Sequence, residues 1–284
     1  MIQDIGEKKL KNEYVKHVPE PGDTLIAVSG GKVLGREKDG ALEFPKYEEL
    51  DETAELLFPV HYLFAVDDES FVLAAPKGED APLKNPAGYE YLTAMQIRRM
   101  SPMDRMLAAA TGIHLCGWYK RHIYCGFCGE KLEKFGDLRA FKCKNCGTEI
   151  FPKIQPAVIV GIINGEELLL TKYAGRAYKR YALVAGYTEI GETAEATVKR
   201  EVMEEVGLKV KNLRYYKSQP WGFSESLLLG FFCELDGEAA IRMDEKELAT
   251  AEWVRRCDIP DGDLVSLTNE MMREFKYKGR KVLE

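Results

Sequence analysis

The chain has 284 residues, of which 45% are hydrophobic and 30% charged, a composition typical of a soluble globular protein with two or three domains. Its net charge of −6 argues against nucleic-acid binding driven by overall charge alone. The first residues, MIQDIGEKKLKNEY, are too charged for a secretory signal, and no run approaches the roughly 18 apolar residues of a membrane helix. We therefore expect a cytoplasmic protein without a membrane partner.

The first 119 residues show short apolar runs separated by turn signals, which favours an N-terminal α+β domain over residues 1–119. TLIAVSGGKVLG carries two such runs, and FPVHYLFAVDDESFVLAAP predicts a hairpin that turns at Asp67-Asp68. A helix is predicted from Ser101-Pro102 through RMLAAATGIHLCGWY, with Pro102 in its first turn.

Residues 120–153 contain two C-x2-C pairs at Cys125/Cys128 and Cys143/Cys146, each followed directly by glycine. Four thiolates at this spacing can close a tetrahedral zinc site, so we expect a zinc ribbon with one structural Zn²⁺ per chain. Because four sulfurs leave no open position for water, this zinc is not expected to be catalytic. Two disulfides are the alternative, and a reducing cytosol disfavours them. The other cysteines have no partner at metal-ligand spacing, and we assign no chemistry to them or to the histidines: Cys116, Cys233, Cys257, His17, His61, His114 and His122.

A mixed α/β pattern begins at Pro156. AVIVGII and ELLLTKY flank Asn164-Gly165, a strong two-residue hairpin signal. YALVAGY, SLLLGFFCEL and EWVRR are further predicted strands, and SLTNEMMREFKY is a predicted C-terminal helix. The order predicts a helix–sheet–helix sandwich over residues 154–284.

The stretch GYTEIGETAEATVKREVMEEVGL, residues 186–208, carries six glutamates. At about 100° per residue, Glu201, Glu204 and Glu205 fall on one arc of a helix. The neighbouring arc holds the predicted core stripe of Val198, Val202, Val206 and Met203, with Thr193 as N-cap and Gly207 as a left-handed stop. A solvated helical face is the ordinary alternative. Carboxylates gathered beside a core stripe instead favour a hard cation such as Mg²⁺ or Mn²⁺.

This stretch resembles the Nudix box, G-x5-E-x7-R-E-U-x-E-E-x-G-U, where U is a bulky aliphatic residue. All its specified positions match: Gly186, Glu192, Arg200, Glu201, Val202, Glu204, Glu205, Gly207 and Leu208. The resemblance implies a loop–helix–loop that holds divalent metal against a pyrophosphate. It also implies the Nudix α/β/α sandwich with a mixed sheet, here preceded by the zinc ribbon and the N-terminal α+β domain.

A second segment is similar to the S-Q-P-W-P-F-P-x-S signature of the NADH pyrophosphatases, a zinc-ribbon-containing group of Nudix hydrolases. In this chain the segment reads SQPWGFSES, so Gly222 and Ser224 stand where that group has proline. Glycine widens the conformational range of a loop that proline stiffens. We therefore expect a more mobile specificity loop here and a less strict preference for NADH.

The resemblance also implies the roles of individual residues. Glu201, Glu204 and Glu205 would be catalytic, and the Mg²⁺ or Mn²⁺ ligands would be Glu201, Glu205, Glu247 and the backbone carbonyl of Ala185. Gly186, Glu192, Arg200 and Gly207 would organise the box, with Arg200 orienting the glutamates. The substrate-binding residues would be Phe151, Gln219, Pro220, Trp221, Gly222, Phe223, Ser224, Glu225, Ser226 and Thr268.

The implied function is metal-dependent hydrolysis of the pyrophosphate bond of NAD(H) to NMN(H) and AMP. Removal of NAD caps from RNA 5′ ends is an implied second activity on the same bond, and a homodimer is the implied assembly. One alternative is a Nudix hydrolase that prefers ADP-ribose or another dinucleotide, which the altered signature allows. An alternative of another class is a zinc-ribbon nucleic-acid-binding protein with an inactive Nudix domain, against which the intact REVMEE segment argues.

Overall fold

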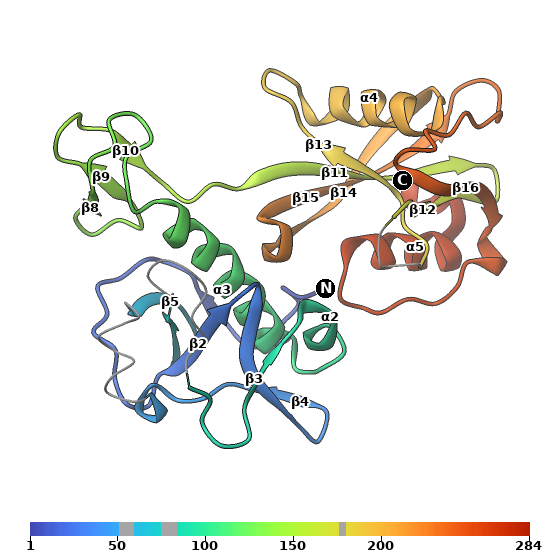
Figure 1. Ribbon diagram of the computed structural model, residues 1–284. Helices are drawn as coiled ribbons and strands as arrows, with labels where there is room; N and C mark the ends of the chain where they lie inside the picture. Colours follow the sequence, from blue (N-terminus) through green and yellow to red (C-terminus); the bar gives the residue numbers. More distant parts are fainter. Residues whose placement is uncertain (51–59, 75–83, 176–179) are drawn as a thin grey trace. The chain divides into compact units, whose positions relative to one another are not determined.

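The computed structural model (Figure 1) describes residues 1–50, 60–74, 84–175 and 180–284. The chain forms two compact units. The C-terminal unit contains Met1, residues 154–221 and residues 226–284. The N-terminal unit contains residues 2–153 and the short segment Gly222–Glu225. In the sequence, this segment lies between two stretches of the C-terminal unit.

The C-terminal unit is built on a mixed sheet. Its main order is β14 (Val210–Trp221), β15 (Ser226–Leu235), β11 (Gln155–Asn164), β12 (Glu167–Tyr173) and β16 (Leu248–Arg255), and β13 (Val184–Tyr187) also pairs with β11. The central pair β11 and β15 runs parallel, whereas the other neighbours are antiparallel.

Two helices cover opposite faces of this sheet, as Figure 1 shows: α4 (Ala194–Val206) and α5 (Leu267–Lys278). The side-chain alternation of β11 explains why both faces are apolar. Val158, Val160 and Ile162 join the core on the α4 side, and Ile159 and Ile163 join the core on the α5 side. The predicted helix–sheet–helix sandwich is thus confirmed.

Two details of this unit differ from the sequence prediction. Asn164 still pairs with Glu167, so the turn residues are Gly165 and Glu166 rather than Asn164-Gly165; glycine occupies the position with φ +61°. The edge strand β14 was not predicted. It pairs with β15 alone and only two of its 12 side chains are buried, so its residues show no clear apolar alternation.

The N-terminal unit contains a second sheet of order β1 (Leu10–Lys11), β5 (Val60–Val66), β6 (Glu69–Ala74), β2 (Thr24–Ser29), β3 (Lys32–Lys38) and β4 (Ala41–Glu43), with β7 (Glu90–Leu92) on β3. The predicted hairpin at Asp67-Asp68 is confirmed, since Val66 pairs with Glu69. Its predicted outer residues 58–59 and 75–76 lie outside the described part of the chain.

The helices of this unit are α2 (Ala94–Ile97) and the long α3 (Met103–Arg121), and the short 3-10 turns of the two units are η1 (Tyr47–Glu49), η2 (Gly222–Ser224), η3 (Arg256–Asp258) and η4 (Gly279–Leu283). Pro102 is the N-cap of α3 rather than a first-turn residue. None of the described helices combines the length and the apolarity needed to cross a bilayer.

A small three-stranded sheet follows α3, in the order β10 (Glu149–Ile150), β9 (Phe141–Cys143) and β8 (Leu132–Lys134). It packs on the end of α3 through Trp118, whose ring stacks on Phe141 at a centroid distance of 4.9 Å.

Candidate active site and metal centres

Helix α4 has the predicted ends. The Thr193 hydroxyl accepts a hydrogen bond from Ala196 N at 3.2 Å. Gly207 has φ +67° and donates its N–H to Met203 O at 3.1 Å. Both ends are therefore fixed by local sequence, which places the glutamates of the helix at set positions relative to the sheet.

The core stripe of α4 is narrower than predicted. Val198, Val202 and Val206, spaced four residues apart, are fully buried, but Met203 is 43% exposed and does not belong to the stripe. A residue one position after Val202 lies about 100° further round the helix. On α4 this rotation carries Met203 out of the face that the sheet covers.

Glu201 and Glu205 lie on the buried side of α4, with exposed fractions of 9% and 2%. Both face residues of β13. An added Cβ at Gly186 would lie 1.9 Å from the Glu201 carboxyl carbon, so the carboxylate occupies space that only glycine leaves open. Glu205 Oε1 accepts a hydrogen bond from Ala185 N at 3.3 Å. The structure therefore brings together the predicted residues of β13 and α4.

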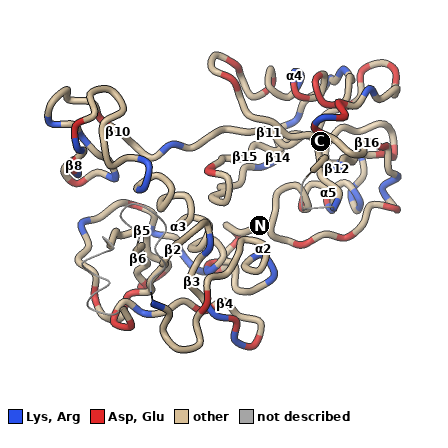
Figure 2. The backbone as a smooth tube through the Cα atoms, viewed as in Figure 1, with Lys and Arg blue, Asp and Glu red and all other residues tan. Residues whose placement is uncertain are grey.

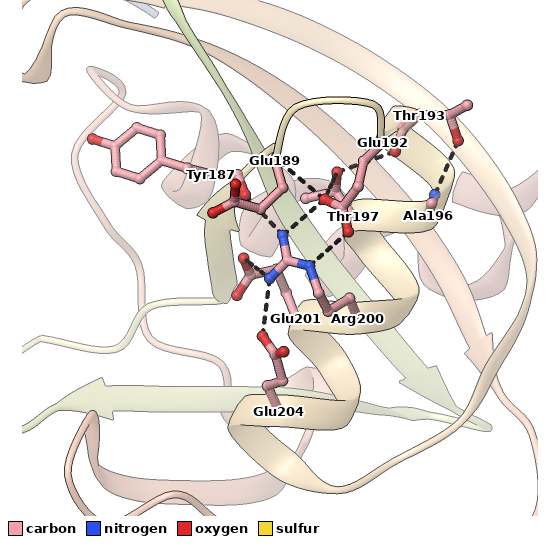
Figure 3. Close-up of polar contacts among 9 residues, drawn as sticks. All are labelled: Tyr187, Glu189, Glu192, Thr193, Ala196, Thr197, Arg200, Glu201 and Glu204. Atoms are coloured by element: carbon pink, nitrogen blue, oxygen red, sulfur yellow. Dashed lines mark hydrogen bonds and ion pairs between the residues drawn. The ribbon is translucent and has the colours of Figure 1, made fainter.

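Arg200 connects the glutamates of the box (Figure 3). Its Nη1 donates to Glu201 Oε1 at 2.7 Å and to Glu204 Oε2 at 2.9 Å, and its Nε donates to Glu192 Oε1 at 2.7 Å. Its Nη2 also donates to the carbonyl of Tyr187 at 2.9 Å. One guanidinium thus links three carboxylates and the end of β13.

The same contacts set the charge states around Arg200. The hydrogen bonds from Arg200 are the main reason that the pKa of Glu192 falls to about 2, while the carboxylates raise the pKa of Arg200. Thr197, fully buried, adds a hydrogen bond from its hydroxyl to Glu192 Oε2 at 3.0 Å. Sequence reasoning missed Thr197, because its position in the box accepts any residue and its burial depends on the sheet.

The electrostatics favour a cation beside α4, where Figure 2 shows Asp and Glu positions (red) along the helix. Burial is the main cause that raises the pKa of Glu201, and the negative charges of Glu204 and Glu247 raise it further. All candidate donors here are oxygens, which suit a hard divalent ion. Among the described residues, the four ribbon cysteines are the only group of three or more His, Cys, Asp or Glu whose potential metal-ligand atoms all lie within 4.8 Å of one another. The glutamates form a more open donor set, as expected for an ion that keeps water ligands.

The four predicted ribbon cysteines converge on one point. Their Sγ atoms all lie within 4.8 Å of one another, with Cys128–Cys143 at 3.4 Å and Cys125–Cys146 at 3.6 Å. A tetrahedral zinc with Zn–S bonds of about 2.3 Å requires sulfurs about 3.8 Å apart, so the cluster fits this ion. All four cysteines are free thiols, so the structure does not contain the two disulfides of the alternative prediction.

The predicted glycines form the two knuckles. Gly129 and Gly147 both have φ +75°, and each donates its N–H to the carbonyl of the first cysteine of its pair at 2.9 Å. The Thr148 hydroxyl lies 3.1 Å from the Cys146 Sγ and is the main cause that lowers the pKa of that thiol to about 6. A thiol that ionises easily is suited to metal binding.

The signature segment spans the end of one strand, a short turn and the start of the next strand. Ser218–Trp221 end strand β14, Gly222–Ser224 form the turn η2, and Ser226 begins β15. Gln219 is fully buried: its Nε2 donates to Val265 O at 2.9 Å, and its Oε1 accepts from Leu267 N at 2.7 Å. The Gln219 amide therefore holds the start of α5 to β14 instead of projecting into open space.

The remaining residues predicted to bind substrate differ in solvent exposure. Pro220 and Ser224 are exposed, and Trp221, Phe223 and Glu225 are partly buried. Ser226 is 3% exposed, with its hydroxyl 3.4 Å from the Tyr187 hydroxyl. Thr268 is partly buried in the first turn of α5. Phe151 belongs to the N-terminal unit and is 50% exposed.

Comparison with known proteins identifies the C-terminal unit. Residues 153–275 match the model of the NUDIX domain, which confirms the resemblance of the box. The chain is 42% identical over 166 residues to the NAD-capped RNA hydrolase NudC of Erwinia tasmaniensis, covering 58% of this chain and 63% of that protein. It is 41% identical over 152 residues to the protein of the same name from Pectobacterium carotovorum, covering 54% and 58%.

A structural comparison gives a Nudix hydrolase from Nitrosomonas europaea, with a TM-score of 0.48 and 20% identity, covering 56% of this chain and 92% of that one. The chain spans less than two thirds of the length of the curated relatives it matches. Its residues 153–275 match the NUDIX domain, and stretches of 152 to 166 of its residues are similar to the NudC proteins.

Proposed function

We propose that this Nudix-domain protein is a metal-dependent pyrophosphohydrolase that cleaves NAD(H) to NMN(H) and AMP. The observation that carries the proposal is the pair Glu201 and Glu205, buried side by side on α4 and facing the glycine-containing end of β13. Buried carboxylates are costly unless a cation or a hydrogen bond compensates them. A divalent ion at this position would compensate both.

The ligands proposed for Mg²⁺ or Mn²⁺ are the carboxylates of Glu201, Glu205 and Glu247 and the carbonyl of Ala185. Such an ion, when bound, neutralises phosphate charge, activates water and stabilises the leaving phosphate. Arg200 keeps the Glu201 carboxylate in place, since Nη1 is shared between Glu201 and Glu204. Glu204 is the proposed further ligand or general base, because its side chain is 59% exposed and a carboxylate oxygen can reach incoming water.

The choice of NAD(H) as substrate rests on two supports, the signature SQPWGFSES and the similarity to proteins named NAD-capped RNA hydrolases. Both point to the same pyrophosphate bond, either in the free dinucleotide or at an RNA 5′ end. We propose NAD-capped RNA as a second substrate. ADP-ribose or another dinucleotide is the second candidate, and the substitution of the signature prolines by Gly222 and Ser224 favours it.

The four cysteines are proposed to hold one structural Zn²⁺, supported by their spacing and by the absence of an open ligand position in an S4 set. The Nudix resemblance further supports a cytoplasmic homodimer, which sedimentation or light scattering would test. The alternative of a nucleic-acid-binding protein with an inactive Nudix domain would require that the box carboxylates bind no catalytic metal.

Product analysis tests the function. Purified protein would be incubated with NADH, NAD⁺, ADP-ribose and NAD-capped RNA, with Mg²⁺ or Mn²⁺, and the products separated by chromatography. Glu205→Gln should reduce turnover by about a hundredfold or more, in line with lost metal-ion catalysis. Glu195→Gln, an exposed residue in the first turn of the same helix, is the matched control and should leave turnover unchanged. AMP release that survives in folded Glu205→Gln would remove this residue from the site.

A further inference from the structure

The turn in the middle of the signature segment packs on helix α3 within the N-terminal unit. Gly222 lies against the backbone of α3: an added Cβ would meet Ala110 O at 2.1 Å and Ala110 C at 2.5 Å. These are main-chain atoms inside a helix and cannot move aside as a flexible side chain can. Glycine at this position, where the NADH pyrophosphatase signature has proline, is what permits the close approach.

The last residue of the turn is fixed to the same helix by charge. The Glu225 carboxylate is ion-paired with the Arg121 guanidinium, in the final turn of α3. Gly117, one turn earlier, makes room for the pair, because a Cβ there would lie 2.8 Å from Glu225 Oε1 and 3.0 Å from Arg121 Nη1. Two positions along α3, at Ala110 and at Gly117–Arg121, thus accommodate the two ends of the turn.

Glu225 also has an uncommon backbone conformation. Its φ of +58° lies in the left-handed region, which a residue with a side chain rarely adopts. Such a conformation persists where surrounding contacts impose it. The contacts around this residue include the Arg121 ion pair, the approach of Gly222 to α3, and the hydrogen bond from Glu225 N to Gly222 O at 3.4 Å.

We infer that Arg121 is a positioning residue for the signature turn: by holding Glu225 in the left-handed conformation, it fixes the path of the chain through Gly222–Glu225. The role at the substrate rests on the pyrophosphohydrolase function proposed above. Glu225 then serves the substrate site through Arg121 rather than by direct contact. Its carboxylate is occupied by a guanidinium, and an anion is a poor partner for a pyrophosphate.

A charge swap tests this role. Arg121→Glu and Glu225→Arg each place like charges opposite one another, and the double variant Arg121→Glu/Glu225→Arg restores an attractive pair. The matched control is the ribbon pair Lys142–Glu149, at 2.9 Å and of similar exposure, which is swapped in the same way. Peptide-resolved hydrogen–deuterium exchange over residues 218–226 and steady-state kinetics with NADH would be measured for each variant.

Each single variant should speed exchange in residues 218–226 and raise KM about three- to tenfold with kcat within about twofold, because uniform binding is lost and the chemistry is not touched. The double variant should recover both, and the control swaps should change neither. Unchanged exchange in both single variants, or a double variant as impaired as the worse single one, would overturn the inference. If Arg121 instead bound substrate phosphate directly, KM would not recover in the double variant.

The exchange measurement separates this inference from the function. Wild-type protein that cleaves no dinucleotide would sink the proposed activity, and the exchange rates would still decide whether Arg121 fixes the turn. If the wild type cleaves NADH but the single variants show unchanged exchange in residues 218–226, the proposed activity stands and the role of Arg121 is wrong.

Discussion

The Glu201 carboxylate occupies the place where a side chain at residue 186 would stand, because an added Cβ would lie 1.9 Å from its carboxyl carbon and 2.1–2.2 Å from its oxygens. Gly186 is therefore required by packing against a functional group rather than by backbone conformation. The first residue of the box and its central glutamate form one steric unit.

Gly186→Ala should displace the Glu201 carboxylate while leaving the fold intact. Since Glu201 is a proposed metal ligand and its displacement would cost positioning and electrostatic stabilisation together, we expect kcat/KM to fall by about a hundredfold or more. Pyrophosphohydrolase assays and circular dichroism would be compared with those of Gly22→Ala, where an added Cβ meets no atom within 4 Å. Equal activity of the two variants would contradict the steric argument.

Cys143→Ser should remove one ligand of the four-sulfur centre and lower thermal stability, since metal binding is coupled to folding at such sites. Metal analysis of the wild type should find one zinc per chain that resists mild chelation. The control is Cys257→Ser, an exposed cysteine outside the cluster. Protein purified without chelator that holds no zinc would count against the ribbon, as would a Cys143→Ser variant that melts with the control.

Restoring proline to the signature should destabilise the protein at one position and leave its stability unchanged at the other. At residue 222 the ring would meet the Ala110 carbonyl oxygen, so Gly222→Pro should destabilise the protein by about 1–3 kcal/mol, the usual cost of overpacking. Ser224 is exposed, so Ser224→Pro should keep the wild-type melting temperature. Calorimetry and kcat/KM for NADH and ADP-ribose would be measured on both; a stable Gly222→Pro variant would show that α3 does not confine the turn.

His61 should make the protein sensitive to mild acid. It is 8% exposed, its ring stacks on Tyr119 at 3.7 Å, and burial is the main cause that lowers its pKa to about 3. The unfolded chain takes up this proton below about pH 6.5 and the folded chain does not, so stability falls as the pH drops through this window. From pH 6.5 to 5 the loss should be about 2 kcal/mol.

His61→Phe should remove this component while keeping an aromatic ring beside Tyr119. Urea denaturation at pH 7 and pH 5 would give the change in the free energy of unfolding for each protein. His114→Phe, at a partly buried histidine that bonds to the Lys153 carbonyl, is the comparison. A wild type and a His61→Phe variant with the same acid dependence would mean that His61 protonates in the folded state.

The sequence predicts those features that depend on local chemistry. The caps Thr193 and Gly207, the cysteine knuckles and the strands with a strong apolar pattern follow from residue type and spacing alone. The edge strand β14 does not, since a strand with only two buried side chains has no apolar period to detect. The role of Thr197 and the contact of Gly186 with Glu201 could not be predicted from the sequence either, because both depend on how α4 packs on the sheet.

The candidate site divides in the same way. The identities of the box residues follow from their spacing, while the connecting role of Arg200 takes its particular form from the positions of Tyr187 and Glu192 in space. The signature segment was expected to form a specificity loop because it resembles the NADH pyrophosphatase signature, with Gly222 and Ser224 in place of proline. Pairing with β15 instead makes it a strand as far as Trp221.

The buried amide of Gln219 limits how this signature can be transplanted. It donates a hydrogen bond to the Val265 carbonyl and accepts one from the Leu267 N–H, so the segment is hydrogen-bonded to the start of α5. A chimera that receives the nine-residue signature without the matching helix start would bury an amide with no counterpart. Exchanging substrate preference between such proteins therefore calls for grafting the strand and the helix entrance as one module.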